Sequence, residues 1–273
     1  MFHVKQRRMD YHLHTVHSFD GRQTIQELCE SMLRQGVEEI CLTEHIEPGH
    51  PDASVDVPPL WDVWMQEIQA MRKAYPLLTI CAGVEIGDHP ARRRETQTML
   101  QDLHLDYHLL SLHLVHGVDC YDAEQYYGGK ARQQAYRDYL EAKAESILAW
   151  NDFDCVAHIG YVSRYAPYDK AEKPLRYDDA PDALDAIFRK LIQEGKALEV
   201  NTSGYDATGD YLPAESLLRR YIDLGGELFT FGSDSHDTSR NYDRIEDAKA
   251  YVRNLGGKYQ ASFYQRKMTA WAI

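Results

Sequence analysis

Short apolar runs alternate with longer amphipathic segments along most of the chain. Seven of the runs have the length and the content of β-branched and aromatic residues that strands favour: MDYHLHT, EEICLTEH, LLTICAGVEI, LDYHLLSLH, DFDCVAHIG, KALEVNTSG and ELFTFGSDSH. The clearest helix lies at residues 24–36, where Thr24 and Glu27 form a capping-box pattern and Gly36 supplies a stop signal. Further helices are predicted at about 59–75, 91–104, 131–150, 180–194, 214–225 and 243–255.

Seven alternations of strand and helix predict an α/β fold of parallel strands with helices outside, as a barrel or as an open doubly wound sheet. A glycine-rich dinucleotide fingerprint does not follow the first strand, which disfavours a Rossmann domain. The length suits one α/β barrel and we find no linker, so we expect a single domain over residues 1–273. Residues 161–182 form a polar excursion that could be a lid or an active-site loop.

Side chains of the types that bind metals stand at the ends of nearly all the predicted strands. The carboxyl ends of parallel strands converge on one face, so these side chains are expected to meet there. A lone histidine at a strand end is usually a structural hydrogen-bonding group, but a cluster inside apolar runs is costly to bury unless something satisfies it. The residues that predict a metal centre are His12, His14, His45, Glu85, His113, His158, Asp234 and His236.

Two of the motifs space their candidate ligands by two residues. His12 and His14, like Asp234 and His236, are separated by one residue, and the period of a strand sends both members of a pair to the same side. Asp20 follows in a loop that can fold back over the strand ends. Imidazole and carboxylate ligands suit zinc, iron or manganese, and a shared carboxylate can bridge two ions.

The charge of the chain limits the kinds of partner that it would bind. Its formal net charge of -13, from 43 acidic and 30 basic residues, argues against a nucleic-acid partner held through phosphates. The first residues lack the apolar core of a signal peptide, and no apolar run approaches the length of a membrane span, so we expect a cytoplasmic protein without a membrane partner. The five cysteines are expected to be buried reduced thiols.

The motifs DYHLHTVHSFDG, LTEH, GVE, SLH, AHIG and GSDSH resemble, in this order, those of the PHP (polymerase and histidinol phosphatase) family. LEVNTSG, together with Ser163 and Arg164 after AHIG, looks closest to the histidinol-phosphatase branch. The resemblance implies a distorted seven-stranded (β/α)7 barrel, similar to a TIM barrel, with a centre of three divalent metal ions. This agrees with the seven alternations read from the hydrophobic pattern.

The resemblance also implies which residue binds which ion. One ion would take His12, His14, Glu85 and Asp234, and a second would share Glu85 and add His113 and His158. The third would use the remaining ligands, which are Asp20, His45 and His236. Some members of the family carry histidine at the position of Asp20, a departure that bears on metal preference.

The activity implied by the resemblance is metal-dependent hydrolysis of a small phosphate monoester, L-histidinol phosphate, to L-histidinol and phosphate in histidine biosynthesis. Asp234, His236 or a metal-bound water could protonate the leaving alkoxide. Arg164 is the candidate phosphate clamp, since a guanidinium offers a fork of donors to phosphate oxygens. His17 could face substrate.

Other assignments stay open at this point. The same metals could cleave a sugar phosphate or a nucleotide, an amidohydrolase also begins with His-x-His, and a metal-binding domain without turnover is a third possibility. Glu199 and Asn201 could face the barrel mouth or bond to nearby loops, and Tyr161, Tyr165 and Tyr205 lie near strand ends. The sequence contains no signal for the oligomeric state.

Overall fold

The computed structural model describes residues 2–3 and 6–273, which form one ten-stranded sheet that is mostly parallel and a separate two-stranded sheet. Seven parallel strands of the large sheet neighbour one another in chain order, so the predicted α/β fold with seven β/α alternations is confirmed. These strands are β2 (Met9–Leu13), β3 (Glu39–Ile46), β4 (Thr79–Gly87), β5 (Tyr107–Ser111), β8 (Cys155–Val156), β9 (Ala197–Asn201) and β10 (Leu228–Gly232).

The two ends of this set meet through the segment that follows β10. The Asp234 N–H donates to the His12 carbonyl at 2.9 Å, and the His14 N–H donates to the Ser235 carbonyl at 2.9 Å. An isolated parallel bridge joins Leu13 to Ser235, but no continuous ladder runs between β2 and β10. The strands therefore approach the predicted barrel in a distorted form.

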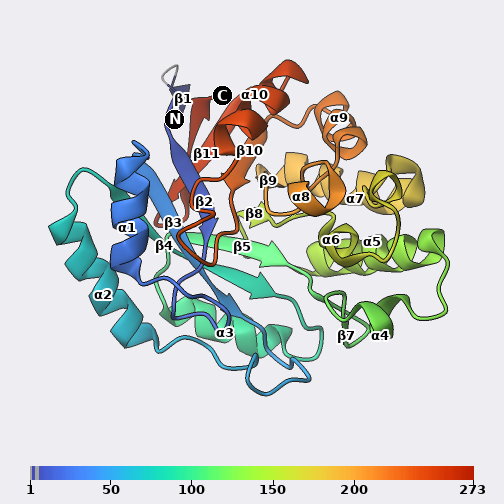
Figure 1. Ribbon diagram of the computed structural model, residues 1–273, viewed down its shortest axis with the longest axis horizontal. Coiled ribbons are helices and arrows are strands. Elements are labelled where there is room, and N and C mark those ends of the chain that lie inside the picture. The colour runs from blue at the N-terminus through green and yellow to red at the C-terminus, as the bar shows by residue number, and fades with distance from the viewer. Residues whose placement is uncertain (1, 4–5) are drawn as a thin grey trace.

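Helices surround the strands, as Figure 1 shows. The seven predicted helices are all present: α1 (Ile25–Arg34), α2 (Trp61–Ala74), α3 (Arg93–Asp102), α5 (Arg132–Ala149), α7 (Pro181–Glu194), α9 (Glu215–Asp223) and α10 (Ile245–Asn254). The capping box is formed: Thr24 Oγ1 accepts from the Glu27 N–H at 3.2 Å, and the Glu27 carboxylate accepts from the Thr24 N–H at 2.8 Å. None of the helices among the described residues is long and apolar enough to cross a bilayer.

Several elements lie outside the sequence prediction. The antiparallel hairpin β11 (Tyr259–Tyr264) and β12 (Lys267–Ala272) extends the sheet beside β10, and β1 (Phe2–His3) pairs with β12, so the two ends of the chain lie together (Figure 1). A small hairpin, β6 (Leu114–Val115) and β7 (Val118–Asp119), follows β5. The short helices are α4 (Ala123–Tyr127), α6 (Tyr161–Tyr165), α8 (Tyr205–Thr208), η1 (Lys170–Glu172) and η2 (Tyr177–Asp179).

The interior between the strands has an apolar part and a polar part. Tyr11 packs with Tyr107 and Phe263 in an inner cluster that also holds Cys41, Cys81 and Cys155, whereas Leu13 packs in the outer core beneath the helices. The register of β2 shifts between Asp10 and Leu13, as at a β-bulge. Within the shifted stretch, two consecutive residues face the interior: Tyr11 lies in the inner cluster, and His12 contacts Glu85 and Glu199. All five cysteines are buried and free, as predicted.

Candidate metal centre

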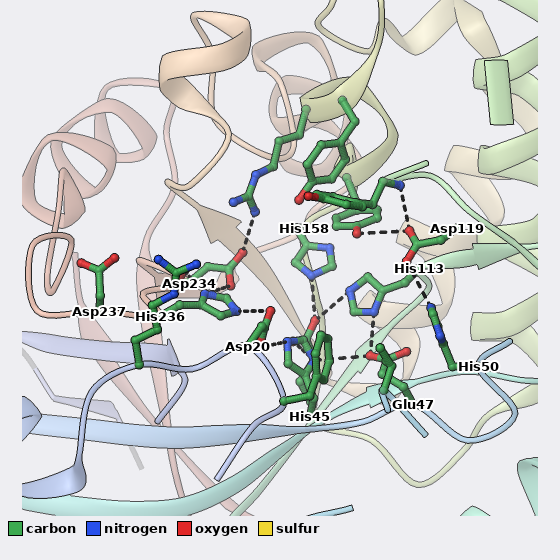
Figure 2. A pocket seen from close by; sticks show the side chains of 18 of the residues that line it. Asp20, His45, Glu47, His50, His113, Asp119, His158, Asp234, His236 and Asp237 are labelled. Carbon is green, nitrogen blue, oxygen red and sulfur yellow. Dashed lines mark hydrogen bonds and ion pairs between the residues drawn. The ribbon is translucent and has the colours of Figure 1, made fainter. Parts of the chain in front are cut away.

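The ends of the parallel strands bring the predicted metal ligands together at one edge of the sheet. Figure 2 shows six of them, which are Asp20, His45, His113, His158, Asp234 and His236. His45 and Glu85 are direct partners in the β3–β4 register. Four sets of donor atoms lie within 4.8 Å of one another: His12, Glu85 and His158; His12, His14 and Asp234; His45, Glu85 and His113; and His14, His45 and His236. The arrangement matches the prediction that the strand ends converge on one site.

Glu85 stands at the middle of the cluster, with a side chain that is only 1% exposed. Its Oε1 lies 2.8 Å from His158 Nε2 and 3.3 Å from His113 Nε2. Its Oε2 lies 3.1 Å from His12 Nε2 and 3.2 Å from His45 Nδ1. A carboxylate whose two oxygens face different histidines is placed to bridge two ions.

Asp234 completes the donor set around β2. Its Oδ1 lies 3.5 Å from His12 Nε2 and 3.4 Å from His14 Nε2. Its Oδ2 accepts hydrogen bonds from Ser203 Oγ at 2.9 Å and from Arg164 Nη1 at 3.3 Å. One oxygen therefore faces the histidines and the other faces the cavity wall.

Asp20 folds back over the strand ends, as the loop position suggested. Its Oδ2 lies 3.0 Å from His236 Nε2, and its Oδ1 lies 3.7 Å from His45 Nε2. The return of the loop depends on Gly21, because a Cβ there would stand 1.8 Å from the Thr15 carbonyl oxygen. The aspartate and the glycine of the opening motif thus serve one local turn.

Two further carboxylates hold the backs of the histidine rings. Glu199 Oε1 lies 2.6 Å from His12 Nδ1, and Glu199 Oε2 accepts from the backbone N–H of His158 at 2.6 Å. Glu47 Oε1 lies 2.7 Å from His113 Nδ1. A carboxylate on Nδ1 fixes the proton there and turns Nε2 toward the centre. Glu47 was not predicted from the sequence, although its position two residues after His45 in TEHIE could have indicated a carboxylate near the ligands.

Burial and neighbouring charges determine which side chains of the cluster are charged: Glu85 is ionised and His14 is neutral. Burial opposes the charge of Glu85, yet His12, His45 and His113 together hold its pKa well below the ordinary value. Burial, reinforced by His45 and His236, lowers the pKa of His14 to about 3. His14 Nε2 is buried and makes no hydrogen bond among the described residues. The neutral His14 ring, with an unused nitrogen, has the form that binds a metal. Burial opposes the charge of His12, His45 and His113, yet nearby carboxylates raise their pKa, so a divalent ion would displace protons from these rings.

The cluster opens into a cavity of about 360 Å³. Arg164 of α6 lines this cavity, where its Nη1 also reaches Ser203 Oγ at 3.1 Å. Within the polar segment at residues 161–182, helix α6 contributes to the cavity wall through Tyr161, Arg164 and Tyr165.

His17 is placed differently from the sequence expectation. Its Nε2 lies 2.8 Å from Glu67 Oε2 on α2, and His17 is not among the residues that line the cavity. The ring is paired with α2 and does not line the cavity, so the structure does not support a substrate contact for His17. Tyr205 likewise packs outside the cavity, against Tyr211.

Comparison with known proteins agrees with the geometry. The sequence profile of the PHP domain matches residues 10–203. The chain is 28% identical over 265 residues to the histidinol-phosphatase of Lactococcus lactis subsp. lactis strain IL1403, a match that covers 96% of each chain. It is 29% identical over 227 residues to a probable histidinol-phosphatase of Clostridium acetobutylicum, which covers 83% of this chain and 86% of the relative.

Solved structures show the same fold. The crystal structure of histidinol phosphate phosphatase from Lactococcus lactis, complexed with zinc, L-histidinol and phosphate, superposes with a TM-score of 0.86 at 26% identity and covers 96% of this chain and 98% of that one. A crystal structure from Listeria monocytogenes, described as that of a putative histidinol phosphatase, gives a TM-score of 0.72 at 20% identity, covering 85% and 96% of the two chains. From the PHP profile and the donor cluster at the strand ends, we conclude that this chain belongs to the PHP domain family.

Proposed function

We propose that this protein is a phosphoric monoester hydrolase that converts L-histidinol phosphate to L-histidinol and phosphate. The observation that carries the proposal is that eight of the nine predicted donors form linked groups beside one cavity, with Asp20 next to His236 and His45. The substrate is supported by the Lactococcus lactis relative, whose structure holds zinc, L-histidinol and phosphate and matches this chain over 96% of its length.

We further propose that the centre holds three divalent ions, of zinc, iron or manganese. His12, His14, Glu85 and Asp234 would hold one ion, and Glu85 would be shared with a second. The second ion would also use His113 and His158, and the third would use Asp20, His45 and His236. Such ions lower the pKa of a bound water, neutralise phosphoryl oxygens and stabilise a leaving alkoxide.

The side chains around the ions would orient the phosphate. Arg164 projects over Asp234 with Nη1 at 3.3 Å from Oδ2, so its remaining N–H groups can meet phosphoryl oxygens placed over the centre. Asp234 and His236 both line the cavity. Burial opposes the charge of Asp234, yet His12 and His14 hold its pKa well below the ordinary value, so His236 is the better candidate proton donor to the leaving alkoxide.

The test is phosphate release from L-histidinol phosphate beside a panel of sugar phosphates and nucleotides, with the metal content of the protein determined. We expect the highest kcat/KM for L-histidinol phosphate, loss of activity on chelation and its return with a divalent metal. If the protein prefers another small phosphate, the assignment as a phosphoric monoester hydrolase stands and the assignment of L-histidinol phosphate as its substrate is wrong. No hydrolysis by fully metallated protein would favour a metal-binding domain without turnover.

A further inference from the structure

The cavity above the metal centre has walls of opposite character. Arg22, Arg164 and Arg240 line the cavity. The Arg22 N–H donates to the His236 carbonyl at 2.8 Å, and Arg164 Nη1 donates to Asp234 Oδ2 at 3.3 Å. On the other side of the centre, Asp119 and His50 lie beyond His113, as Figure 2 shows. A phosphate monoester placed with its phosphoryl group beside the arginines would extend its alcohol portion toward Asp119.

Asp119 is held firmly at the end of the β6–β7 hairpin. Its Oδ1 accepts from the Tyr121 N–H at 2.8 Å and from the Tyr161 hydroxyl at 3.3 Å. Its Oδ2 lies 3.4 Å from His50 Nε2. The carboxylate therefore has a fixed position, while its side chain remains 23% exposed to the cavity.

The charge of Asp119 has no cationic side chain paired with it. Among the described residues, no lysine or arginine forms an ion pair with this carboxylate. The neighbour of the carboxylate is the His50 ring, whose Nε2 lies 3.4 Å from Asp119 Oδ2 and whose Nδ1 accepts from the Asp52 N–H at 3.1 Å. A carboxylate fixed in this way is prepared for an ammonium group brought by a ligand.

Aromatic rings stand next to Asp119. Tyr161 packs edge-on against Tyr165 with centroids 5.1 Å apart, and Tyr165 packs edge-on against Tyr121 at 5.0 Å. The Tyr161 ring also lies 4.7 Å from the ring of His113. Tyrosine rings in such a wall contact flat heterocycles and favour nearby cations.

We propose that Asp119 is the specificity-determining residue of this cavity, selecting phosphate monoesters whose alcohol carries a protonated amine, with Tyr121, Tyr161 and Tyr165 holding the ring of that alcohol. The inference rests on the proposed function and deepens it. It explains how one metal centre would distinguish an amino alcohol phosphate from sugar phosphates and nucleotides, whose alcohols lack an ammonium group.

The experiment compares Asp119→Asn with the wild type on L-histidinol phosphate and on its deamino analogue, imidazolylpropyl phosphate. Asparagine keeps the Oδ1 acceptor for the Tyr121 N–H, removes the charge and replaces the oxygen that faces His50 Nε2 with an NH2 group. We expect D119N to reduce kcat/KM for L-histidinol phosphate about 10- to 100-fold more than for the analogue, mainly through KM, as for a lost hydrogen bond to a charged group. Calorimetry should show the same selective loss for L-histidinol over imidazolylpropanol.

The matched control is Asp122→Asn, which removes a nearby negative charge outside the cavity. Asp122 caps α4 through the Gln125 N–H at 3.1 Å, and asparagine caps equally well, so D122N should leave both substrates unchanged. Equal losses for both substrates in D119N, or no loss in either, would overturn the inference while the proposed function stands. A wild type that does not hydrolyse L-histidinol phosphate at all would overturn the proposed function, and the inference with it.

Discussion

A carboxylate behind a histidine ring decides which nitrogen faces the metal centre. Glu47 and Glu199 do this for His113 and His12, and both are almost fully buried. Glu199 alternates with Asn201 along a strand, so its direction was one of two readings of the sequence. Glu47 was missed because a glutamate that follows a ligand motif can equally well be solvated, and only the position of His113, in the segment after β5, gives it a role.

Replacing Glu47 with glutamine should weaken metal binding without unfolding the protein. Glutamine can still accept from His113 Nδ1, but it no longer carries the charge that makes the ring a better ligand. We expect about 10- to 100-fold lower affinity for the bound ions. The measurement is metal content after dialysis against graded chelator concentrations. Glu67→Gln, on α2 and outside the cavity, is the control and should retain its metal.

His108 should make the stability of the protein fall in mild acid. Burial, reinforced by the Arg266 guanidinium, lowers the pKa of His108 to about 4 from its ordinary value of 6.5. Between these values the unfolded chain binds a proton that the folded chain refuses, so stability is full above pH 6.5 and is lost as the pH falls toward 4. The loss is at most about 3 kcal/mol.

The measurement is urea unfolding of wild type and His108→Gln at neutral pH and near pH 5. Glutamine does not titrate and can still accept from Arg266 Nη1, which lies 2.6 Å from His108 Nδ1. The variant should therefore gain stability relative to the wild type as the pH falls. A difference between the two proteins that does not change with pH would contradict the assignment.

At the scale of elements, the β11–β12 hairpin closes the interior at the end opposite the metal centre. Phe263 packs on Tyr107 with ring centroids 5.0 Å apart, and its backbone N–H donates to the Tyr11 hydroxyl at 2.9 Å. At the hairpin turn, the Gln265 N–H donates to Asp106 Oδ1 at 2.9 Å. The hairpin is therefore part of the core that supports β2 and its histidines.

Phe263→Ala should destabilise the fold by about 3–5 kcal/mol, because it leaves a cavity beneath Tyr11 and Tyr107. Tyr264→Ala, one residue further on the exposed side of the strand, should cost little, since that ring is 63% exposed. Denaturant midpoints of the two variants provide the test. Equal midpoints would show that the hairpin only covers the surface.

The sequence predicted the seven β/α alternations and missed the elements outside them, including the six-residue strands β11 and β12. Seven strands and seven helices follow from hydrophobic periodicity, and their order brings the ligand motifs to one edge. The β6–β7 hairpin has strands of two residues, which are too short to show a period, and it carries Asp119. His17 stands inside the opening motif, but its direction depends on Glu67 of a helix fifty residues away.

At the scale of the whole molecule, the sheet and the metal centre join segments from the entire chain. Chelation should abolish activity and lower the melting temperature by several degrees, because ions that bind only the folded state stabilise it by mass action. Readdition of a divalent metal should restore both. A melting temperature unaffected by chelation, in protein shown to have lost its metal, would mean that the donor cluster is stable without ions.

The hydrogen bonds between His12, His14 and the segment at Asp234 and Ser235 have a consequence for synthesis. The first ligands leave the ribosome with the opening strand, but the two final ones, Asp234 and His236, are encoded more than two hundred residues later. A nascent or prematurely terminated chain that ends before Asp234 therefore lacks two of the proposed metal ligands. Complete metal loading requires that translation proceed past His236.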